Sequence, residues 1–225
     1  MRECGQSFEA SCYEEYGAFK RYKLVDGKMH HYYENDKNLK SDKHIVTYTY
    51  KDNILKYNAD NGVFSKERVD FGTNVLLNSL PDIGDKKRVL DVGCGYGVVG
   101  IAIAKSNSNI TVEMIDVNER AVDLTNENIR LNKVGNATSY LSNLYENVKG
   151  SFDYIISNPP IRAGKEIVHG VAKNGYEHLN KGGKIYLVIQ KKQGAPSLEK
   201  CLNEVFGNVQ VVDKKNGYFV LMSEK

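Results

Sequence analysis

The chain has 225 residues, of which 41% are hydrophobic, and a formal net charge of +3. This composition suits one large domain with a sizeable core and excludes wholesale disorder. No apolar run is long enough to cross a bilayer and no signal-peptide pattern is visible, so no membrane association is expected. The cysteines are scattered without C-x-x-C spacing, which predicts a reduced, cytoplasmic protein and no metal site.

The N-terminal segment differs from the rest of the chain. Residues 1–40 are polar and rich in tyrosine, and they show no sustained periodicity. We expect a poorly packed, partly disordered arm. Met29 is an alternative start, in which case residues 1–28 are an upstream extension. Residues 41–225 are expected to form the folded domain.

A β-hairpin and a helix are predicted at the start of that domain. Apolar residues alternate at 45–50 and 54–57 across a Lys-Asp-Asn turn, which is typical of a hairpin. A loop at 58–66 then leads to a helix at 69–80, which Pro81 closes.

From residue 88 onward, short apolar strands alternate with segments of helix length, which predicts a doubly wound, mostly parallel α/β sheet. The expected strands are 88–92, 110–115, 137–141, 153–157 and 183–189. The expected helices are 97–105, 118–132, 165–179, which Gly182-Gly183 ends, and 196–206. Residues 209–212 and 218–222 are expected to complete a seven-stranded sheet as an antiparallel hairpin.

A glycine-rich loop follows the strand that ends at Asp91. Gly93, Gly95 and Gly97 occupy alternate positions, where they let the backbone turn tightly and approach a ligand. Residues 95–100 also match the dinucleotide fingerprint G-x-G-x-x-G. A carboxylate beside an anionic pyrophosphate is unfavourable, whereas Asp91 favours the ammonium and sulfonium of S-adenosylmethionine. A glycine turn without a ligand is the alternative.

Ligands of open parallel sheets bind beyond the carboxyl ends of the strands. The second strand delivers Asp116, 25 residues after Asp91, where its carboxylate can accept both ribose hydroxyls and Val117 can lie against adenine. Capping of the next helix is the alternative for Asp116. After the third strand, Asn143, with Leu144 beside it, is a candidate for the adenine edge, or ordinary turn material.

The fourth strand ends in Asn158-Pro159-Pro160. Two prolines restrict φ and remove two backbone donors, which leaves carbonyl acceptors beside the Asn158 side chain. Such a rim can accept both hydrogens of a planar –NH₂ group, so that the nitrogen lone pair points at the sulfonium methyl group. Alignment of this kind supplies much of the catalysis in methyl transfer. A structural proline-rich strand exit is the alternative.

These motifs carry a family resemblance over about residues 29–225. The chain resembles class I S-adenosylmethionine-dependent methyltransferases of the Asn-Pro-Pro amino-methylating group. It is most similar to the RsmC-type small-subunit rRNA guanine-N(2) methyltransferases, in a single-domain form. The resemblance rests on GVFSK at 62–66 with VDFGT at 69–73, on 89–97, and on NPPIRAGK at 158–165.

The resemblance implies a Rossmann-like fold and roles for particular residues. Asn158 and the Pro159 carbonyl would position the target amine, while Phe64 and the Gly72-Thr73 helix start would close over the methionine end of the cofactor. A helix N-terminus is a suitable partner for that carboxylate. Many relatives have a base-stacking aromatic residue where this chain has Ile161, which leaves Phe64 as the stacking candidate.

The expected substrate is ribosomal RNA, alone or in the small ribosomal subunit. Arg162 and Lys165, with Lys66, Arg68 and Lys191-Lys192, would contact phosphates, unless they are ordinary solvated lysines and arginines. The expected reaction is methylation of the 2-amino group of guanine. The alternatives are a glutamine amide, an adenine amino group, or a non-catalytic RNA-binding assembly factor. A monomer or weak homodimer is expected.

Overall fold

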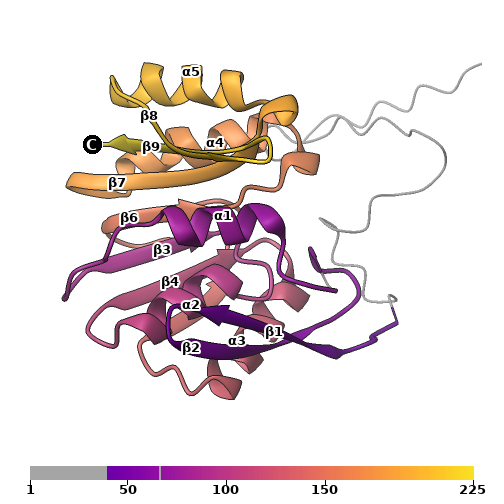
Figure 1. Cartoon of the computed structure of the whole chain (residues 1–225). Helices are drawn as coiled ribbons and strands as arrows, with labels where there is room; N and C mark the ends of the chain where they lie inside the picture. Colours follow the sequence, from indigo (N-terminus) through magenta and orange to yellow (C-terminus); the bar gives the residue numbers. More distant parts are fainter. Residues whose placement is uncertain (1–39, 66) are drawn as a thin grey trace, which may run out of the picture.

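The computed structural model describes residues 40–65 and 67–225, so the arm predicted at 1–40 lies outside the described residues except for Lys40. Its central element is a seven-stranded sheet in the spatial order β5-β4-β3-β6-β7-β9-β8. Figure 1 shows the succession from β4 to β9. Strands β3 to β7 are parallel, whereas β9 runs antiparallel to β7 and β8 antiparallel to β9. The strands are β3 (Arg88–Val92), β4 (Thr111–Asp116), β5 (Ala137–Leu141), β6 (Phe152–Ser157), β7 (Leu179–Gln190), β8 (Gln210–Lys215) and β9 (Tyr218–Glu224).

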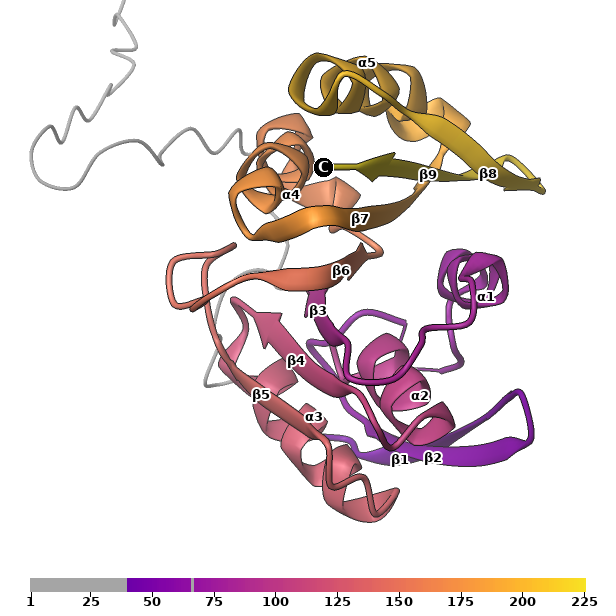
Figure 2. The same ribbon diagram turned by 90° about the vertical axis from the view of Figure 1, so that its left-hand side faces the viewer.

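Helices cover both faces of this sheet. The first three pack in one hydrophobic core and the last two in another, and Figure 2 shows α1 and α2 on one side of the sheet with α4 and α5 on the other. Among the described residues, no helix is long and apolar enough to cross a membrane. The helices are α1 (Phe71–Ser79), α2 (Val98–Ser106), α3 (Glu119–Leu131), α4 (Lys165–Glu177) and α5 (Ala195–Phe206), with short 3₁₀ turns η1 (Ile161–Ala163) and η2 (Lys191–Gln193).

The chain path explains where a ligand can bind. It enters the sheet at the central strand β3, moves outward through β4 and β5, and returns across β3 to β6 and β7. Strand order therefore reverses beside β3, and the loops after β3, β4 and β6 surround this switch point at the carboxyl edge. The predicted doubly wound sheet with a C-terminal antiparallel hairpin is confirmed.

The predicted N-terminal hairpin is also confirmed. Strands β1 (His44–Tyr50) and β2 (Asn53–Ala59) form a separate antiparallel pair that packs against α2 and α3. The buried amide of Asn128 on α3 holds β2 in place: its Oδ1 accepts from the Asn58 N–H at 2.7 Å and its Nδ2 donates to the Asn58 carbonyl at 3.0 Å.

The structure corrects the predicted end of α4. This helix ends at Glu177, and Gly182-Gly183, expected to terminate it, lie inside β7, which begins at Leu179. Leu179 pairs with Phe152 before the register shifts. Gly182 has φ +75°, and a Cβ on Gly183 would lie 2.9 Å from a backbone carbonyl oxygen. The glycines therefore allow a bulge within the strand rather than a helix stop.

Candidate cofactor and substrate site

The glycine loop between β3 and α2 crosses to the neighbouring strand. The N–H groups of Gly93 and Cys94 donate to the Ile115 carbonyl of β4 at 2.8 and 3.0 Å. The glycines have positive φ angles, +71° at Gly93, +58° at Gly95 and +91° at Gly97. Side chains are strained at such angles, so the sequence of alternating glycines is required by the loop conformation itself.

The glycines of the loop differ in what surrounds them. A Cβ on Gly95 would meet nothing within 4 Å, whereas one on Gly97 would lie 2.9 Å from side-chain atoms of Ile101 and Thr125. A Cβ on Gly100 would lie 2.4 Å from Met114. Gly95 therefore borders open space. The absence of a side chain at Gly97 and Gly100 lets the start of α2 lie close to Thr125 and Met114.

Asp91 lies beneath this loop. Its side chain is 2% exposed, and Oδ2 accepts a hydrogen bond from the Gly100 N–H at 2.9 Å. Burial raises the pKa of Asp91 to about 7, the hydrogen bond opposes that rise, and the nearby Asp116 carboxylate adds to it. The carboxyl group therefore anchors the first turn of α2 and contributes negative charge under the loop when it ionises.

Asp116 lies at the end of β4 and faces the same loop. Its Oδ2 accepts from the Gly95 N–H and its Oδ1 from the Asn118 N–H, both at 2.9 Å. Burial raises the pKa of Asp116, and these hydrogen bonds oppose that rise. Asn118 is the N-cap of α3, so Asp116 is not needed for capping. A carboxylate has about four acceptor positions, which leaves some of them for a ligand.

Two apolar residues and an amide continue the site. Val117, next to Asp116, is 39% exposed. The Asn143 Nδ2 donates to Glu146 at 2.8 Å, which leaves its Oδ1 as an acceptor. Leu144 has φ +49° and its side chain packs toward Gly170 of α4, so only its backbone is left for the predicted cofactor contact.

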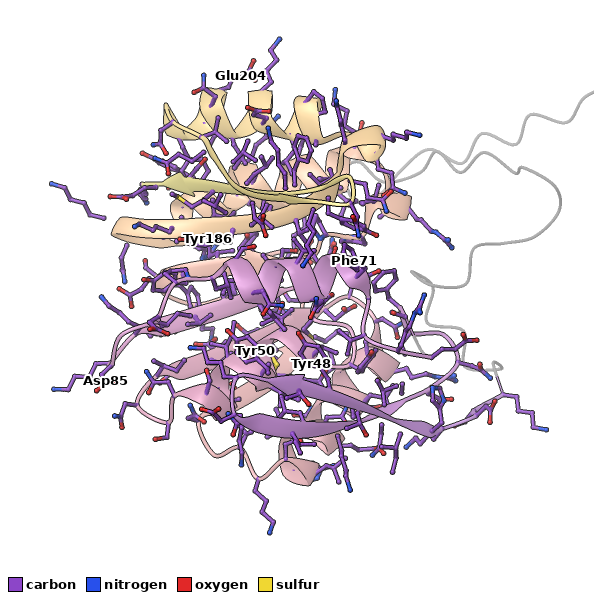
Figure 3. The ribbon with its side chains drawn as sticks, in the orientation of Figure 1. Tyr48, Tyr50, Phe71, Asp85, Tyr186 and Glu204 are labelled. Carbon is purple, nitrogen blue, oxygen red and sulfur yellow. The ribbon has the colours of Figure 1, made fainter. Side chains whose placement is uncertain are left out.

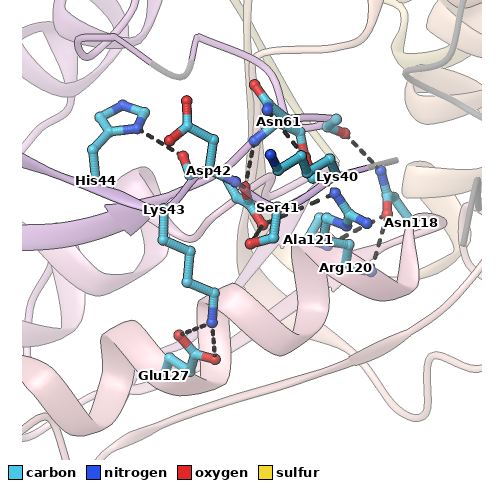
Figure 4. Close-up of polar contacts among 12 residues, drawn as sticks. Lys40, Ser41, Asp42, Lys43, His44, Asn61, Asn118, Arg120, Ala121 and Glu127 are labelled. Carbon is cyan, nitrogen blue, oxygen red and sulfur yellow. Dashed lines mark hydrogen bonds and ion pairs between the residues drawn. The ribbon is translucent and has the colours of Figure 1, made fainter. Parts of the chain in front are cut away.

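The loop at 60–65 is hydrogen-bonded to the glycine loop and to the start of α3. The Tyr96 hydroxyl donates to the Ser65 carbonyl at 3.2 Å, and the Asn118 Nδ2 donates to the Gly62 carbonyl at 3.1 Å. Figure 4 shows the polar contacts around Asn61 of this loop, including the hydrogen bond that Arg120 donates to the Asn61 carbonyl. Phe64, predicted to close over the cofactor, is thereby held near the glycine loop and is 46% exposed.

The Asn158 side chain is oriented by the start of α1. Its Nδ2 donates to Asp70 Oδ2 at 3.1 Å and to Thr73 Oγ1 at 2.9 Å. Both amide hydrogens are therefore used, and Oδ1 remains as an acceptor. Asp70 also caps α1 by accepting from the N–H groups of Gly72 and Thr73. In this structure these amides therefore donate to Asp70, and the contact of Thr73 with a cofactor carboxylate stays a prediction.

The two prolines differ in their carbonyl groups. The Pro160 carbonyl accepts from the Ala163 N–H at 2.9 Å, whereas no described donor reaches the Pro159 carbonyl. Pro160 lies against the glycine loop, since a Cβ on Gly93 would be 3.7 Å from its Cδ. The remaining acceptors of the Asn-Pro-Pro segment are thus Asn158 Oδ1 and the Pro159 carbonyl, and they adjoin the predicted cofactor loop.

The other predicted substrate residues lie after this segment. Ile161 is half-buried and packs against the core beneath α4, while Arg162 and Lys165 are exposed. Lys66 lies outside the described residues. Across 40–65 and 67–225, no group of three or more His, Cys, Asp or Glu side chains could hold a metal ion.

Sequence reasoning quoted Asp70 and Phe71 within the VDFGT motif without giving either a role, and it did not link Phe71 with Tyr218. An Asp before a helix is a recognisable capping signal, but nothing in the sequence links it to Asn158, 88 residues later. The rings of Phe71 and Tyr218 lie with their centroids 5.5 Å apart, although the two residues are far apart in the chain.

Comparisons with known proteins identify the family of this chain. The methyltransferase small domain family matches residues 55–222. The chain is 44% identical over 197 residues to the uncharacterized protein YbxB of Bacillus subtilis, covering 87% of this chain and 98% of that protein. It is 34% identical to ribosomal RNA small subunit methyltransferase C of Citrobacter koseri, covering 72% of this chain and 47% of that protein.

Solved structures show the same fold. The 16S rRNA N2 G1207 methyltransferase RsmC of T. thermophilus, in complex with AdoMet and guanosine, matches with a TM-score of 0.75 and 25% identity. That match covers 83% of this chain and 52% of the other, so the chain spans about half the length of the named rRNA enzymes. A ribosomal protein L11 methylase from Lactobacillus delbrueckii matches with a TM-score of 0.60 and 23% identity, covering 71% of this chain and 85% of that one, and shows the fold alone. The chain thus has the Rossmann-like class I fold and belongs to the methyltransferase small domain family, as an RsmC-type member.

Proposed function

We propose that this protein transfers a methyl group from S-adenosylmethionine to the exocyclic 2-amino group of a guanine in small-subunit ribosomal RNA. The observation that carries this proposal is the orientation of Asn158. With both Nδ2 hydrogens donated to Asp70 and Thr73, its Oδ1 and the Pro159 carbonyl are left as acceptors for a planar amine. The matches to rRNA methyltransferases support RNA as the acceptor.

The residues present suit this cofactor. Asp116 retains acceptor positions for the ribose hydroxyls, and Val117 offers exposed apolar surface for adenine. Asn143 Oδ1 can accept from the adenine amino group, because its Nδ2 is used by Glu146. The open space over Gly95 gives the ligand room to approach the loop backbone.

S-adenosylmethionine supplies a methyl group on a positively charged sulfur. Asn158 and Pro159 accept the two amine hydrogens and so direct the nitrogen lone pair toward that methyl group. Neither acceptor is a base at neutral pH, so they would only orient the amine. As the N–C bond formed, the bond between the methyl carbon and sulfur would break to leave a neutral thioether, and the extra amine proton would pass to water. Pro160, packed on the glycine loop, fixes the distance between acceptor and donor sites.

The test is Asn158→Ala. We expect the methylation rate to fall by about 10²-fold or more, because removal of one positioned transition-state contact has that effect, while affinity for S-adenosylmethionine stays close to that of the parent. Asn174→Ala, on the exposed face of α4, is the matched control and should change neither quantity. The assay uses tritiated cofactor and small subunits from a strain lacking this protein.

Separation of the products decides between acceptors. Label recovered as N2-methylguanosine supports the proposal, and an Asn158→Ala variant with parental rate would overturn the assigned site. Label in ribosomal protein alone would instead identify a glutamine amide, and N6-methyladenosine would identify adenine. Cofactor binding without transfer to any of these would favour an assembly factor.

A further inference from the structure

A second group of side chains lies at the carboxyl edge, beside the Asn158 site. Strand β7, parallel to β6, ends at Gln190 and leads into η2, and Tyr218 of β9 pairs with Gln190. Lys215, the last residue of β8, pairs with Tyr218. The Lys191 N–H donates to the Gly217 carbonyl at 2.8 Å, which joins η2 to the β8–β9 turn. The η2 turn and the β8–β9 turn therefore form one continuous surface next to the end of β6.

The aromatic part of this surface is contiguous with Asn158. A Cβ on Gly72 would lie 2.7 Å from Tyr218 Cε1, so this ring rests on the start of α1. Phe71, whose ring neighbours that of Tyr218, is 37% exposed. Figure 3 labels it at the end of α1 that faces this edge. Asp70 and Thr73, on either side of Phe71 and Gly72, are the residues that hold the Asn158 amide.

The charged part consists of exposed lysines without acidic partners. Within the described residues, Lys191, Lys192 and Lys215 form no ion pair, whereas Lys87 and Lys184, nearer the opposite edge of the sheet, pair with Asp153 and Glu224. Asp213 adjoins the cluster, but it accepts a hydrogen bond from Ser79 of α1 at 3.0 Å. All three lysines are exposed. Lys214 is not part of this surface, because it pairs with Phe219 on the other face of the sheet and its Nζ lies 4.8 Å from the Phe219 ring centroid.

We propose that this aromatic–lysine surface, Phe71 and Tyr218 with Lys191, Lys192 and Lys215, binds single-stranded RNA adjoining the nucleotide whose amine enters the Asn158 site. The inference rests on the proposed function and adds the path of the RNA. Lysines neutralise phosphates, and aromatic rings stack unpaired bases, a combination that suits a single strand. Bases within a duplex are stacked on one another and cannot reach the rings.

The experiment measures binding of a fluorescein-labelled, unstructured 15-nucleotide RNA by fluorescence anisotropy over a salt series. Lys191→Gln/Lys192→Gln should weaken binding and lower the slope of log K against log salt by about 1.4, and Lys215→Gln should lower it by about 0.7, since each phosphate contact contributes about 0.7. The matched control is Lys149→Gln/Lys181→Gln, which removes two exposed lysines near the opposite edge and should leave the slope unchanged.

The aromatic contribution is tested with Tyr218→Leu, which keeps apolar contact with α1. We expect roughly 5- to 100-fold weaker binding of the RNA with the salt slope retained, because stacking is lost and phosphate contacts are not. Cofactor affinity, measured by calorimetry, should be unchanged in all of these variants, which shows that they are folded.

The outcomes separate this surface from the proposed function. Any one of four results would overturn the surface. They are parental RNA affinity in both lysine variants, an equal loss of affinity in the control, tighter binding of a 16-base-pair RNA duplex, and displacement of the RNA by a polyglutamate peptide. If the lysine variants behave as expected but the parent methylates no RNA, the surface stands and the proposed function fails. If Asn158→Ala abolishes RNA methylation while the lysine variants bind RNA as tightly as the parent, the proposed function stands and the RNA-binding surface fails.

Discussion

Replacement of Asp91 by Asn should stabilise the protein in a pH-dependent manner. In the folded chain, burial raises the pKa of Asp91 from its ordinary value of 3.8 to about 7. The folded state therefore keeps this proton to higher pH than the unfolded state does. Stability is at its full value below about pH 4, decreases as pH rises toward 7, and stays reduced above pH 7. A difference of about three pH units corresponds to roughly 4 kcal/mol.

The amide introduced by Asp91→Asn would imitate the protonated acid, since its oxygen can still accept from the Gly100 N–H. We therefore expect the variant to match the parent near pH 4 and to exceed its unfolding free energy by up to about 4 kcal/mol at pH 8. This difference already includes relief of the repulsion with Asp116. The assay is urea unfolding of the cofactor-free protein from pH 4 to 8.

The control is Asp123→Asn, the same chemical change on an exposed position of α3, which should shift stability by a few tenths of a kcal/mol at most. An Asp91→Asn protein less stable than the parent at pH 8, or a difference that does not change with pH, would refute the reasoning. Asp91→Asn should also bind the cationic cofactor more weakly than the parent above pH 7, because the ionised carboxylate is then absent. Both results together would mean that Asp91 lowers the stability of the empty protein and raises its affinity for the cofactor.

Further variants test the loop glycines and the orientation of Asn158. Gly95→Ala should cost only about 1 kcal/mol of stability from its positive φ but lose cofactor affinity, as calorimetry would show. Gly97→Ala should cost about 2 kcal/mol or more in thermal unfolding, because its Cβ would collide with Ile101 and Thr125. Asp70→Ala should lower kcat by about 10- to 100-fold with little change in KM for the cofactor, and Asp70→Asn, which keeps an acceptor oxygen, should restore most of it. Equal stability of the two glycine variants, or parental kcat in Asp70→Ala, would contradict these assignments.

The elements that sequence reasoning predicted well depend on local patterns. Alternation of apolar residues located the strands, and the rule that ligands bind beyond the carboxyl ends placed Asp91, Asp116 and Asn158 around one edge. The end of α4 was predicted wrongly because Gly182-Gly183 was interpreted as a helix stop. A positive-φ glycine serves a helix end or a β-bulge equally well, and only the pairing of β7 with β6 distinguishes them.

The details of the site depend on contacts between distant segments. A sequence shows that Asn158 follows a strand, but not which side of its amide faces a ligand. That orientation is decided by Asp70 and Thr73 on a helix that precedes the sheet. The same holds for Phe71 and Tyr218, which meet because β9 returns antiparallel to the edge where α1 begins.

Two asparagines of the site are oriented in the same way, by neighbours that accept their amide hydrogens. Asn143 donates through its Nδ2 to Glu146, and Asn158 donates through its Nδ2 to Asp70 and Thr73. An amide whose hydrogens are bound elsewhere presents only its oxygen, so both residues are prepared to accept from amino groups. The cofactor's adenine and the proposed guanine each carry such a group. On the proposed function, recognition of both would depend on neighbours of the asparagines, of which Glu146 and Asp70 are acidic. Replacing those neighbours should then disturb binding or transfer as selectively as replacing the asparagines.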